Sequence, residues 1–395
     1  MITHIEDLPL EGPIGIHKTV SILKAIQHQQ SITLSLKWDG SPAIIFGTNP
    51  DNGKFFISLK SMAHLMYTNE DIDQYITIPD LNRKMKIALK YLPELGQNKI
   101  YQCDIMWTKE NLWVDWIAGK RQILMRPNEI VYSVPEATEI ASEFSTKRLG
   151  IAVHTEYTTD VHKMAWNHIG NDGIEQSTNG TRTPLKSRVV QSPVEYNLEQ
   201  SPNIMIFPIT TSIILTSEDT TRYSKLLSQL EVMATKVNPR LYSQLAASHR
   251  ITRYLRLYQN STLKTDSLKT LLNGITTSEF SSKFYSFVET QLNKDILTLH
   301  RKKSRENRIK DRDIFLKKLV VLLPVVEQIK AVQALTVQLK MIILDHIPQN
   351  MFGTWYKDDV LVPGKHEGLV VTDHLTDIHV KLVDRENFSR RNFRL

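Results

Sequence analysis

Apolar residues recur in blocks along the chain, some at helical spacing and some alternating as in strands. Spacings of three and four residues predict helices over 16–27 and 80–95. The Asn52-Gly53 pair lies between two apolar runs and predicts a hairpin turn. Strands are predicted over 32–36, 43–46, 100–107, 129–134 and 150–155. This mixed order predicts an α+β domain that is rich in antiparallel strands.

The pattern changes near residue 167. The stretch 170–202 is rich in Gly, Ser, Thr, Asn and Pro, which predicts a loop or linker. From about 219 to 347 the pattern is helical, and strand patterns return at 359–362, 368–372 and 378–383. We therefore expect a core formed by residues 1–169 and 350–395, with a linker and a largely helical inserted domain at 170–349.

Composition narrows the class of protein. The chain has 395 residues, 41% of them hydrophobic, and a net charge of +7, which is compatible with a nucleic-acid partner or simply with a soluble cationic protein. The single cysteine, Cys103, excludes a disulfide framework and a Cys-based zinc site and favours a reducing, cytoplasmic setting. The start of the chain is acidic and interrupted by Pro, so no signal peptide is expected. We expect no membrane partner, an apolar core segment around Leu319 to Val326, and a monomer.

One strongly basic segment covers residues 301–318, RKKSRENRIKDRDIFLKK. It is compatible with a solvated helix face carrying pairs such as Glu306 with Lys310. The alternative is a surface that contacts nucleic-acid phosphates. The phosphate-contacting residues would then be Arg301, Lys302, Lys303, Arg305 and Arg308.

The segment KWDG at 37–40 carries the candidate nucleophile. A lysine held at a strand end can attack phosphorus once its amine is neutral. Gly40 allows a sharp backbone turn, and Asp39 can hold that turn or position a nucleotide. Taken alone, the segment also fits an ordinary exposed hairpin turn.

Four further charged residues follow on predicted strands. Lys60 follows the hairpin, Asp104 lies in an apolar strand, Glu367 begins another strand and Lys381 lies on the last one. Each alone fits an exposed strand or turn residue. Together, lysines and acids at successive strand ends predict a phosphoryl-transfer site.

These motifs resemble the covalent nucleotidyltransferase superfamily, which comprises ATP-dependent DNA ligases, RNA ligases and mRNA capping enzymes. KWDGSPAIIFG is similar to the nucleophile motif, YQCDIMW to a later acidic motif, HEGLVV to the Glu-Gly motif and HVKLVD to the last strand. The wider sequence pattern resembles ligase-like proteins of T4-like tailed phages. The resemblance covers roughly residues 1–165 and 350–395. It implies an ATP-grasp-like ligase nucleotidyltransferase core of antiparallel sheets.

The resemblance also implies roles for individual residues. Lys37 would carry AMP, and Lys381 would contact the α-phosphate as a second catalytic residue. ATP would be held by Asp39, Gly40, Lys60, Asp104, Tyr132 and Glu367, with Tyr132 stacking on adenine and Tyr157 or His154 as alternatives. Asp104 and Glu367 would bind Mg²⁺ or Mn²⁺.

Three departures from the family pattern bear on the substrate. Pro42 stands where DNA ligases usually carry Arg, and His379 stands where the last strand usually has a first Lys. No OB-fold follows the last strand; a short basic tail does, in which Arg390 and Arg391 could clamp phosphate or simply fray. These departures favour an ATP-dependent RNA ligase, in the host-cell cytoplasm if phage-encoded. The alternatives are a DNA nick-sealing ligase, an end-adenylylating or guanylylating transferase, and a non-catalytic nucleic-acid-binding protein with a ligase fold.

Overall fold

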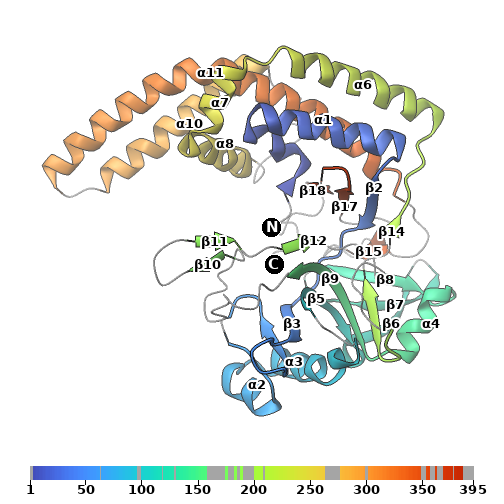
Figure 1. The fold of residues 1–395 in the computed structure, drawn as a ribbon. Helices are drawn as coiled ribbons and strands as arrows, with labels where there is room; N and C mark the ends of the chain where they lie inside the picture. The colour runs from blue at the N-terminus through green and yellow to red at the C-terminus, as the bar shows by residue number, and fades with distance from the viewer. Residues whose placement is uncertain are drawn as a thin grey trace.

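The computed structural model has an α+β fold, as the hydrophobic pattern predicts, with helices covering several sheets (Figure 1). The structure describes residues 3–62, 64–95, 99–117, 119–128, 130–157, 174–176, 182–184, 187–189, 200–207, 210–262, 276–298, 301–347, 353–355, 361–362, 368–376 and 378–385.

The helices form two groups. The larger group contains η1 (Ile5–Glu11), α1 (Pro13–His28), α6 (Ser217–Thr235), α7 (Pro239–Ala246), α8 (His249–Thr262), α10 (Thr277–Leu297) and α11 (Lys302–Leu344). The smaller elements are α2 (Asn69–Tyr75), α3 (Pro79–Tyr91), η2 (Leu92–Leu95), η3 (Lys109–Asn111) and α4 (Glu139–Thr146). In Figure 1 the larger group lies above the sheets, and α2 and α3 lie below them.

The upper sheet joins the two ends of the chain. Its strand order is β1-β18-β17-β2-β14, and all its pairs are antiparallel except β1 with β18. The strands are β1 (Thr3–His4), β2 (Ile32–Leu36), β14 (Thr210–Thr211), β17 (Gly368–Asp373) and β18 (Ile378–Val383). Alternation places Leu34, Leu369 and Leu382 in the core shared with the helices, and Ser35, Val370 and Lys381 on the opposite face.

The middle sheet has the order β12-β9-β5-β3-β4, and β13 pairs with β9. Its strands are β3 (Ala43–Thr48), β4 (Phe55–Leu59), β5 (Ile100–Thr108), β9 (Leu149–Tyr157), β12 (Ser187–Val189) and β13 (Ile204–Phe207). One face packs on α3 through a core that includes Ile44, Cys103 and Met85. Because the helices of the two sheets lie on opposite sides, the faces that they leave uncovered are directed toward each other (Figure 1).

A third sheet has the order β16-β15-β8-β7-β6, and among the described strands β10 and β11 form a separate pair. The strands are β6 (Leu112–Ile117), β7 (Lys120–Met125), β8 (Val131–Pro135), β10 (Ile174–Gln176), β11 (Arg182–Pro184), β15 (Gly353–Trp355) and β16 (Leu361–Val362). The prediction that 170–202 is only a loop or linker was therefore wrong in part. Three short strands lie within it, and β12 extends the middle sheet.

The helices of the predicted insertion share one hydrophobic core with the upper sheet and with the start of the chain. Ile22 of α1, Leu227 of α6, Leu319 of α11 and Val380 of β18 all belong to this core. Tyr223 of α6 donates a hydrogen bond of 2.9 Å to the backbone oxygen of Leu23 in α1. The helical layer thus covers the upper sheet directly, whereas the boundaries at 170 and 350 stay a prediction.

Within the described residues, one helix is long and apolar enough by length and composition to cross a membrane. It covers Lys303–Leu344, and 56% of its apolar window is buried inside the molecule. Leu319, Leu322 and Val326 are among its buried residues, as expected for the apolar core segment. A core helix therefore accounts for the same composition.

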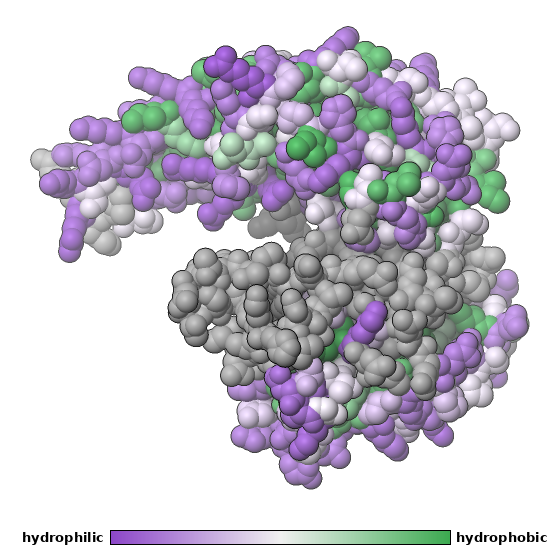
Figure 2. All heavy atoms as spheres, in the orientation of Figure 1, coloured by the Kyte–Doolittle hydropathy of each residue, from purple (hydrophilic) through white to green (hydrophobic). Residues whose placement is uncertain are grey.

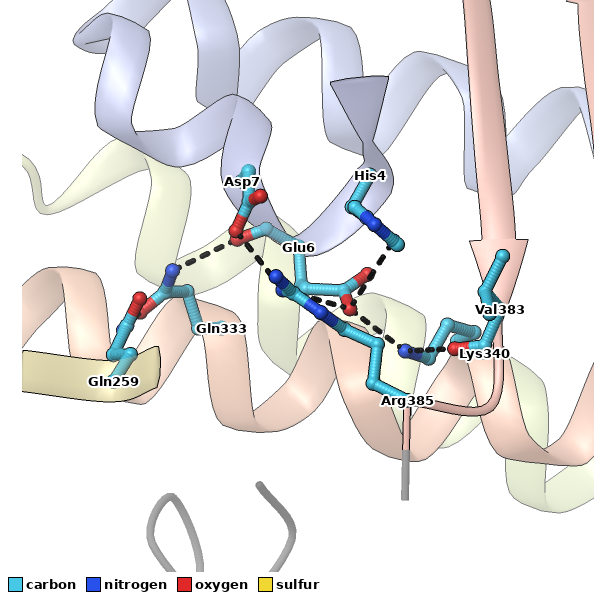
Figure 3. Close-up of polar contacts among 8 residues, drawn as sticks. All are labelled: His4, Glu6, Asp7, Gln259, Gln333, Lys340, Val383 and Arg385. Carbon is cyan, nitrogen blue, oxygen red and sulfur yellow. Dashed lines mark hydrogen bonds and ion pairs between the residues drawn. The ribbon is translucent and has the colours of Figure 1, made fainter. Parts of the chain in front are cut away.

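A buried ion pair joins the start of the chain to α11 and to the end of β18 (Figure 3). The Nζ atom of Lys340 lies 2.9 Å from Oε1 of Glu6 and donates a second hydrogen bond of 2.9 Å to the backbone oxygen of Val383. Arg385 approaches the same Glu6 oxygen at 3.5 Å and Oδ1 of Asp7 at 3.3 Å. Glu6 and Lys340 are 1% and 2% exposed, so their charges stabilise each other without water.

Burial and charge act in opposite directions on the acids of this cluster. Burial by itself would raise the pKa of Glu6, but Lys340 and Arg385 outweigh it and hold that pKa at about 2. Burial raises the pKa of Asp7, with Arg385 opposing the shift. Burial also lowers the pKa of His4 to about 2, with the cations Arg385, Lys381 and Lys340 acting in the same direction.

Acid should destabilise the fold first through His4. Its imidazole stays neutral in the folded chain but gains a proton below about pH 6.5 in the unfolded chain, so stability falls as the pH drops below that value. Because the folded pKa is far lower, His4 should cost about 2 kcal/mol between pH 6.5 and 5. Urea unfolding at several pH values should show this loss in the wild type and not in His4→Gln. Glu6, whose pKa is depressed, should add its own loss only below about pH 4.5.

The matched control is His28→Gln, because His28 is exposed at the end of α1. This variant should keep the pH dependence of the wild type. An equal loss of stability between pH 6.5 and 5 in His4→Gln and in the wild type would contradict the assignment.

Candidate active site

The segment from Lys37 to Pro42 carries the chain from the upper sheet to the middle sheet. At its start, the backbone N–H of Lys37 donates to the backbone oxygen of Gly368 at 2.8 Å, which continues the pairing of β2 with β17. At its end, the N–H of Ser41 donates to the backbone oxygen of Ile105 at 3.0 Å. The two bonds attach the segment to one strand of each sheet.

Gly40 lies where this segment passes β5 at close range. A Cβ atom at this position would lie 2.7 Å from Cβ of Asp104, 2.8 Å from the backbone oxygen of Ile105 and 2.8 Å from Sδ of Met106. The backbone N–H of Gly40 donates to Oδ2 of Asp104 at 3.3 Å. Only glycine fits here, because the backbone of β5 lies too close for a side chain. The Asp104 carboxylate accepts a hydrogen bond from the backbone of the same turn.

Both backbone polar groups of Asp39 are hydrogen-bonded to side chains of other residues. Its N–H donates to the hydroxyl of Tyr132 at 3.1 Å, and its carbonyl accepts a hydrogen bond of 2.6 Å from Nδ2 of Asn128. Its carboxylate oxygen Oδ1 lies 3.9 Å from Nζ of Lys37. The Lys37 side chain is 17% exposed and that of Asp39 is 37% exposed, so the amine lies in a partly enclosed place that a ligand can still reach.

Trp38 anchors the same segment in the core. It is 2% exposed, and its ring packs on Tyr132 at 5.3 Å and edge-on to Phe207 at 4.6 Å between centroids. Moving a buried Trp out of its contacts with other aromatic rings is unfavourable, because those contacts and its burial stabilise the fold. Trp38 therefore fixes the residues on either side of it, Lys37 and Asp39.

Lys60 and Asp104 come from the middle sheet. The N–H of Lys60 donates to the backbone oxygen of Ala43 at 3.0 Å, and Ala43 pairs with Asp104 on its other side. Lys60 directly follows β4, so the three residues form one row across the edge of the sheet, and paired residues share a face. That face is the one that α3 does not cover. In the otherwise buried strand β5, Asp104 alone is partly accessible.

Lys381 lies on the upper sheet, on the same face as Lys37. Lys381 pairs with Val370, which pairs with Ser35, and Ser35 precedes Lys37 by two residues. Alternation therefore directs both lysines away from the helical layer. On its other side Lys381 pairs with His4 of β1. The structure thus brings two lysines from one sheet and an acid and a lysine from another to the two facing surfaces.

The structure does not support the adenine-stacking role predicted for Tyr132. Its ring is 0% exposed, so it offers no open face to a base, and its hydroxyl supports Asp39 instead. The alternative, Tyr157, is 8% exposed, and its hydroxyl donates to Oε1 of Gln102 at 2.9 Å. Burial raises the pKa of Tyr157 to about 12. The residue that stacks on a base stays an open prediction.

Several predicted residues lie outside what the structure describes. They are Glu367, Arg390, Arg391 and the side chains of His154 and Lys302. Arg301, Lys303, Arg305 and Arg308 are described and belong to the start of α11, not to the facing sheet surfaces. In the part of the chain that is described, no three His, Cys, Asp or Glu residues gather as metal ligands. Asp104 is the one predicted metal ligand whose surroundings are known.

The comparisons with known proteins bear on the whole chain. The model of a protein family described as a family of unknown function, DUF6267, matches residues 2–395. The chain belongs to the DUF6267 family. A search of curated proteins and a search of solved structures each gave no match.

Two residues of this DUF6267 chain that contact the KWDG segment were not predicted from the sequence. Asn128 lies far from the KWDG segment in sequence. Its Oδ1 accepts a hydrogen bond of 2.6 Å from the N–H of Ile130, and this local turn was the feature that could have drawn attention to it. Phe207 lies beyond the polar stretch at 170–202 and reaches Trp38 only through the pairing of β13 with β9.

Gly40→Ala should disrupt the site more than it disrupts the fold. The added methyl group must displace Asp104 or the backbone of β5, at a cost of about 1–3 kcal/mol. Urea unfolding should measure that loss. If Lys37 is the nucleophile that the sequence predicts, labelling of the protein with ATP should fall much further, because Lys37 moves with the turn. Gly53→Asn is the control, because nothing lies within 4 Å of its Cβ position and Asn is among the residues that best tolerate the left-handed φ of 67° found there. Equal labelling by the two variants would contradict the argument.

Proposed function

We propose that this protein is an ATP-dependent polynucleotide ligase, with RNA ligase favoured, that forms a covalent lysyl-AMP on Lys37. The observation that carries the proposal is the position of Lys37. Its amine lies 3.9 Å from Asp39 on a segment held between two sheets, with Asp104 bound to the backbone of that segment at 3.3 Å. The motifs KWDG, HEGLVV and HVKLVD of the resemblance support the same function.

The first reaction is the attack of Lys37 on the α-phosphorus of ATP. A neutral amine supplies its electron pair, a P–N bond forms, the bond from the α-phosphorus to the bridging oxygen breaks, and pyrophosphate leaves. The nitrogen also loses a proton, which passes to solvent water. Asp39, 3.9 Å from Nζ, is placed to hold the amine before attack. Lys381, on the same sheet face, would stabilise the negative charge of the α-phosphate.

The divalent cation of such a reaction would offset phosphate charge. Mg²⁺ is often bound by one or two carboxylates together with phosphate oxygens. Asp104 is the described carboxylate that fits this need, because it is partly accessible in a buried strand. Glu367, next to Gly368 in the sequence, is the second candidate.

The later reactions follow from ligase chemistry. The 5′-phosphate of a strand would attack the AMP phosphorus and release Lys37, and a 3′-hydroxyl would then displace AMP and join the strands. Lys37 acts as the leaving group in the first of these steps and is regenerated. Only the first covalent step depends directly on the described geometry.

Labelling should test the covalent step. With α-labelled ATP and Mg²⁺, the wild type should retain label on a denaturing gel, and Lys37→Ala should not, because the nucleophile is gone. Lys54→Ala is the matched control, since Lys54 is an exposed lysine of the neighbouring hairpin. The label should be released by acid and retained in alkali, as expected for a P–N bond.

The outcomes separate the alternatives. Label that persists in Lys37→Ala would reject Lys37 as the nucleophile, and an unlabelled wild type would favour a non-catalytic binding protein. Labelling by GTP in place of ATP would favour a guanylylating transferase. Nicked and single-stranded RNA and DNA, supplied to the labelled protein, should then separate strand joining from end adenylylation.

A further inference from the structure

Helix α8 presents an exposed basic face, defined here as His249, Arg253 and Arg256. These residues are spaced by four and three positions, so they lie on one side of the helix, and all three are exposed. The opposite side is buried, with Ile251 and Leu255 in the hydrophobic core. Packing of the apolar side therefore directs the basic face outward.

The basic face lies within the longest stretch of the sequence that contains no acid. No Asp or Glu occurs in the 34 residues between Glu231 and Asp266, which contain six Lys and Arg residues. A solvated helix face is commonly stabilised by pairs of opposite charge three or four residues apart. Solubility alone does not account for a segment that has only one sign of charge.

Other helices of this protein pair their cations with acids one turn away. On α3, Asp80 forms ion pairs with Arg83 and with Lys84, the latter at 3.0 Å. On α10, Glu279 forms an ion pair of 2.8 Å with Lys283. Helix α8 has no acid of its own for such a pair. The charge of its basic face must therefore be balanced by another element or by a bound anion.

Asp7 of η1 is an acid that lies close enough to Arg256 to be affected by its charge. Arg256 acts to lower the pKa of Asp7, but Arg385 has the larger effect, and its Nη1 lies 3.3 Å from Oδ1 of Asp7. The Asp7 side chain is 17% exposed, so little of it faces solvent. One covered carboxylate shared by two arginines leaves the basic face positively charged.

Two buried glutamines attach α8 to the elements that hold the last strand (Figure 3). Nε2 of Gln259 donates to Oε1 of Gln333 in α11 at 2.6 Å, and Nε2 of Gln333 donates to the backbone oxygen of Glu6 at 2.8 Å. Glu6 belongs to the buried cluster that fixes β18 to the helical layer. Since Lys381 of β18 pairs with His4, two residues before Glu6, the basic face has a fixed position relative to Lys381.

Helix α8 lies on the side of the helical layer that is turned toward the sheets. In Figure 1 it lies at the lower edge of the helical group, whereas α6 lies along the top. Figure 2 shows mainly hydrophilic side chains along the same lower edge. Lys37 and Lys381 also face away from the helical layer, toward the middle sheet. A strand with one end at Lys37 would therefore leave the site on the side of the helical layer where α8 lies.

We propose that the basic face of α8 binds the phosphate backbone of the nucleic-acid substrate beside its reacting end. The identity of the polyanion rests on the proposed function. Guanidinium groups suit this role, because they bind phosphate oxygens in a bidentate manner. His249 to Arg256 span about 10 Å along the helix axis, which is about three nucleotide steps of one strand. A contact to phosphates is independent of base sequence.

Two double variants of the full chain test the proposal. Arg253→Gln/Arg256→Gln removes two charges from the basic face, and Arg222→Gln/Lys225→Gln removes two charges of the same spacing from exposed positions of α6. Binding of a fluorescein-labelled nicked RNA duplex should be measured by anisotropy over a range of salt concentrations. Circular dichroism and urea unfolding should verify that the variants fold. Arg253→Glu alone is a second test, which leaves Arg256 and Asp7 in place.

The α8 double variant should bind at least about tenfold more weakly, and its salt slope should fall by about 1 to 2, because two phosphate contacts are lost. Arg253→Glu should also weaken binding, by at least about fivefold, because it adds repulsion of phosphate. The α6 variant should stay within about threefold of the wild type. Equal weakening of the two double variants would overturn the proposal, because total charge would then be the cause.

Three further outcomes would also overturn it. They are unchanged binding by the α8 variants, a wild type that does not bind the duplex, and vesicles rich in phosphatidylserine whose binding depends on the basic face while duplex binding does not.

Labelling with ATP separates this inference from the proposed function. The α8 double variant should keep its Lys37 label, because the basic face does not form the covalent site. An unlabelled wild type whose duplex binding depends on Arg253 and Arg256 would reject the ligase and support the binding surface. A labelled wild type with duplex binding that is independent of these arginines would support the ligase and overturn the binding surface.

Discussion

The backbone crossing from Lys37 to Pro42 is the constraint on which the rest of the site depends. One end is bonded to Gly368 of the upper sheet and the other to Ile105 of the middle sheet. Only the residues between these two bonds are free to adjust, and Trp38 and Gly40 remove most of that freedom. Trp38 is buried among aromatic rings, and Gly40 has no space for a side chain. Neither sheet can therefore shift without moving the Lys37 amine.

The buried cluster around Glu6 plays the same part for the last strand. A buried ion pair adds little net stability, because removing both charges from water costs about as much as their attraction returns. Its effect here is on position. Lys340 bonds Glu6 near the start of the chain and the backbone oxygen of Val383 at the end of β18. Strand β18, which carries Lys381, is thereby fixed to the helical layer at one register.

Much of the fold follows from local patterns in the sequence. The strand patterns at 368–372 and 378–383 agree with β17 and β18 to within one residue, because alternation is strong where one face meets a helical core. The hairpin of β6 and β7 was not predicted, since its exposed Trp113 and Trp116 blur the alternation. The three-residue strands of 170–202 were not predicted either, because a Ser- and Thr-rich segment gives no periodic signal over so short a length.

The site was predictable in its residue types and only partly in its geometry. KWDG could be recognised because three chemical requirements, a nucleophile, an acid and a tight turn, fall on consecutive residues. The role of Tyr132 could not, because an aromatic residue in a strand fits a core position as well as a binding surface. Its full burial is a property of how three sheets meet, and no local pattern contains that information.

The helical layer determines which face of the upper sheet carries Lys37 and Lys381. Leu34 and Leu36 alternate with Ser35 and Lys37, so one face of β2 is apolar and the other is polar. The apolar face must be covered, and α1, α6 and α11 supply the shared core that covers it. Because side chains alternate along a strand, Lys37 and Lys381 lie on the other face, which is directed toward the middle sheet that carries Asp104. The helices from 217 to 344 therefore contribute to the site even though none of their described residues belongs to it.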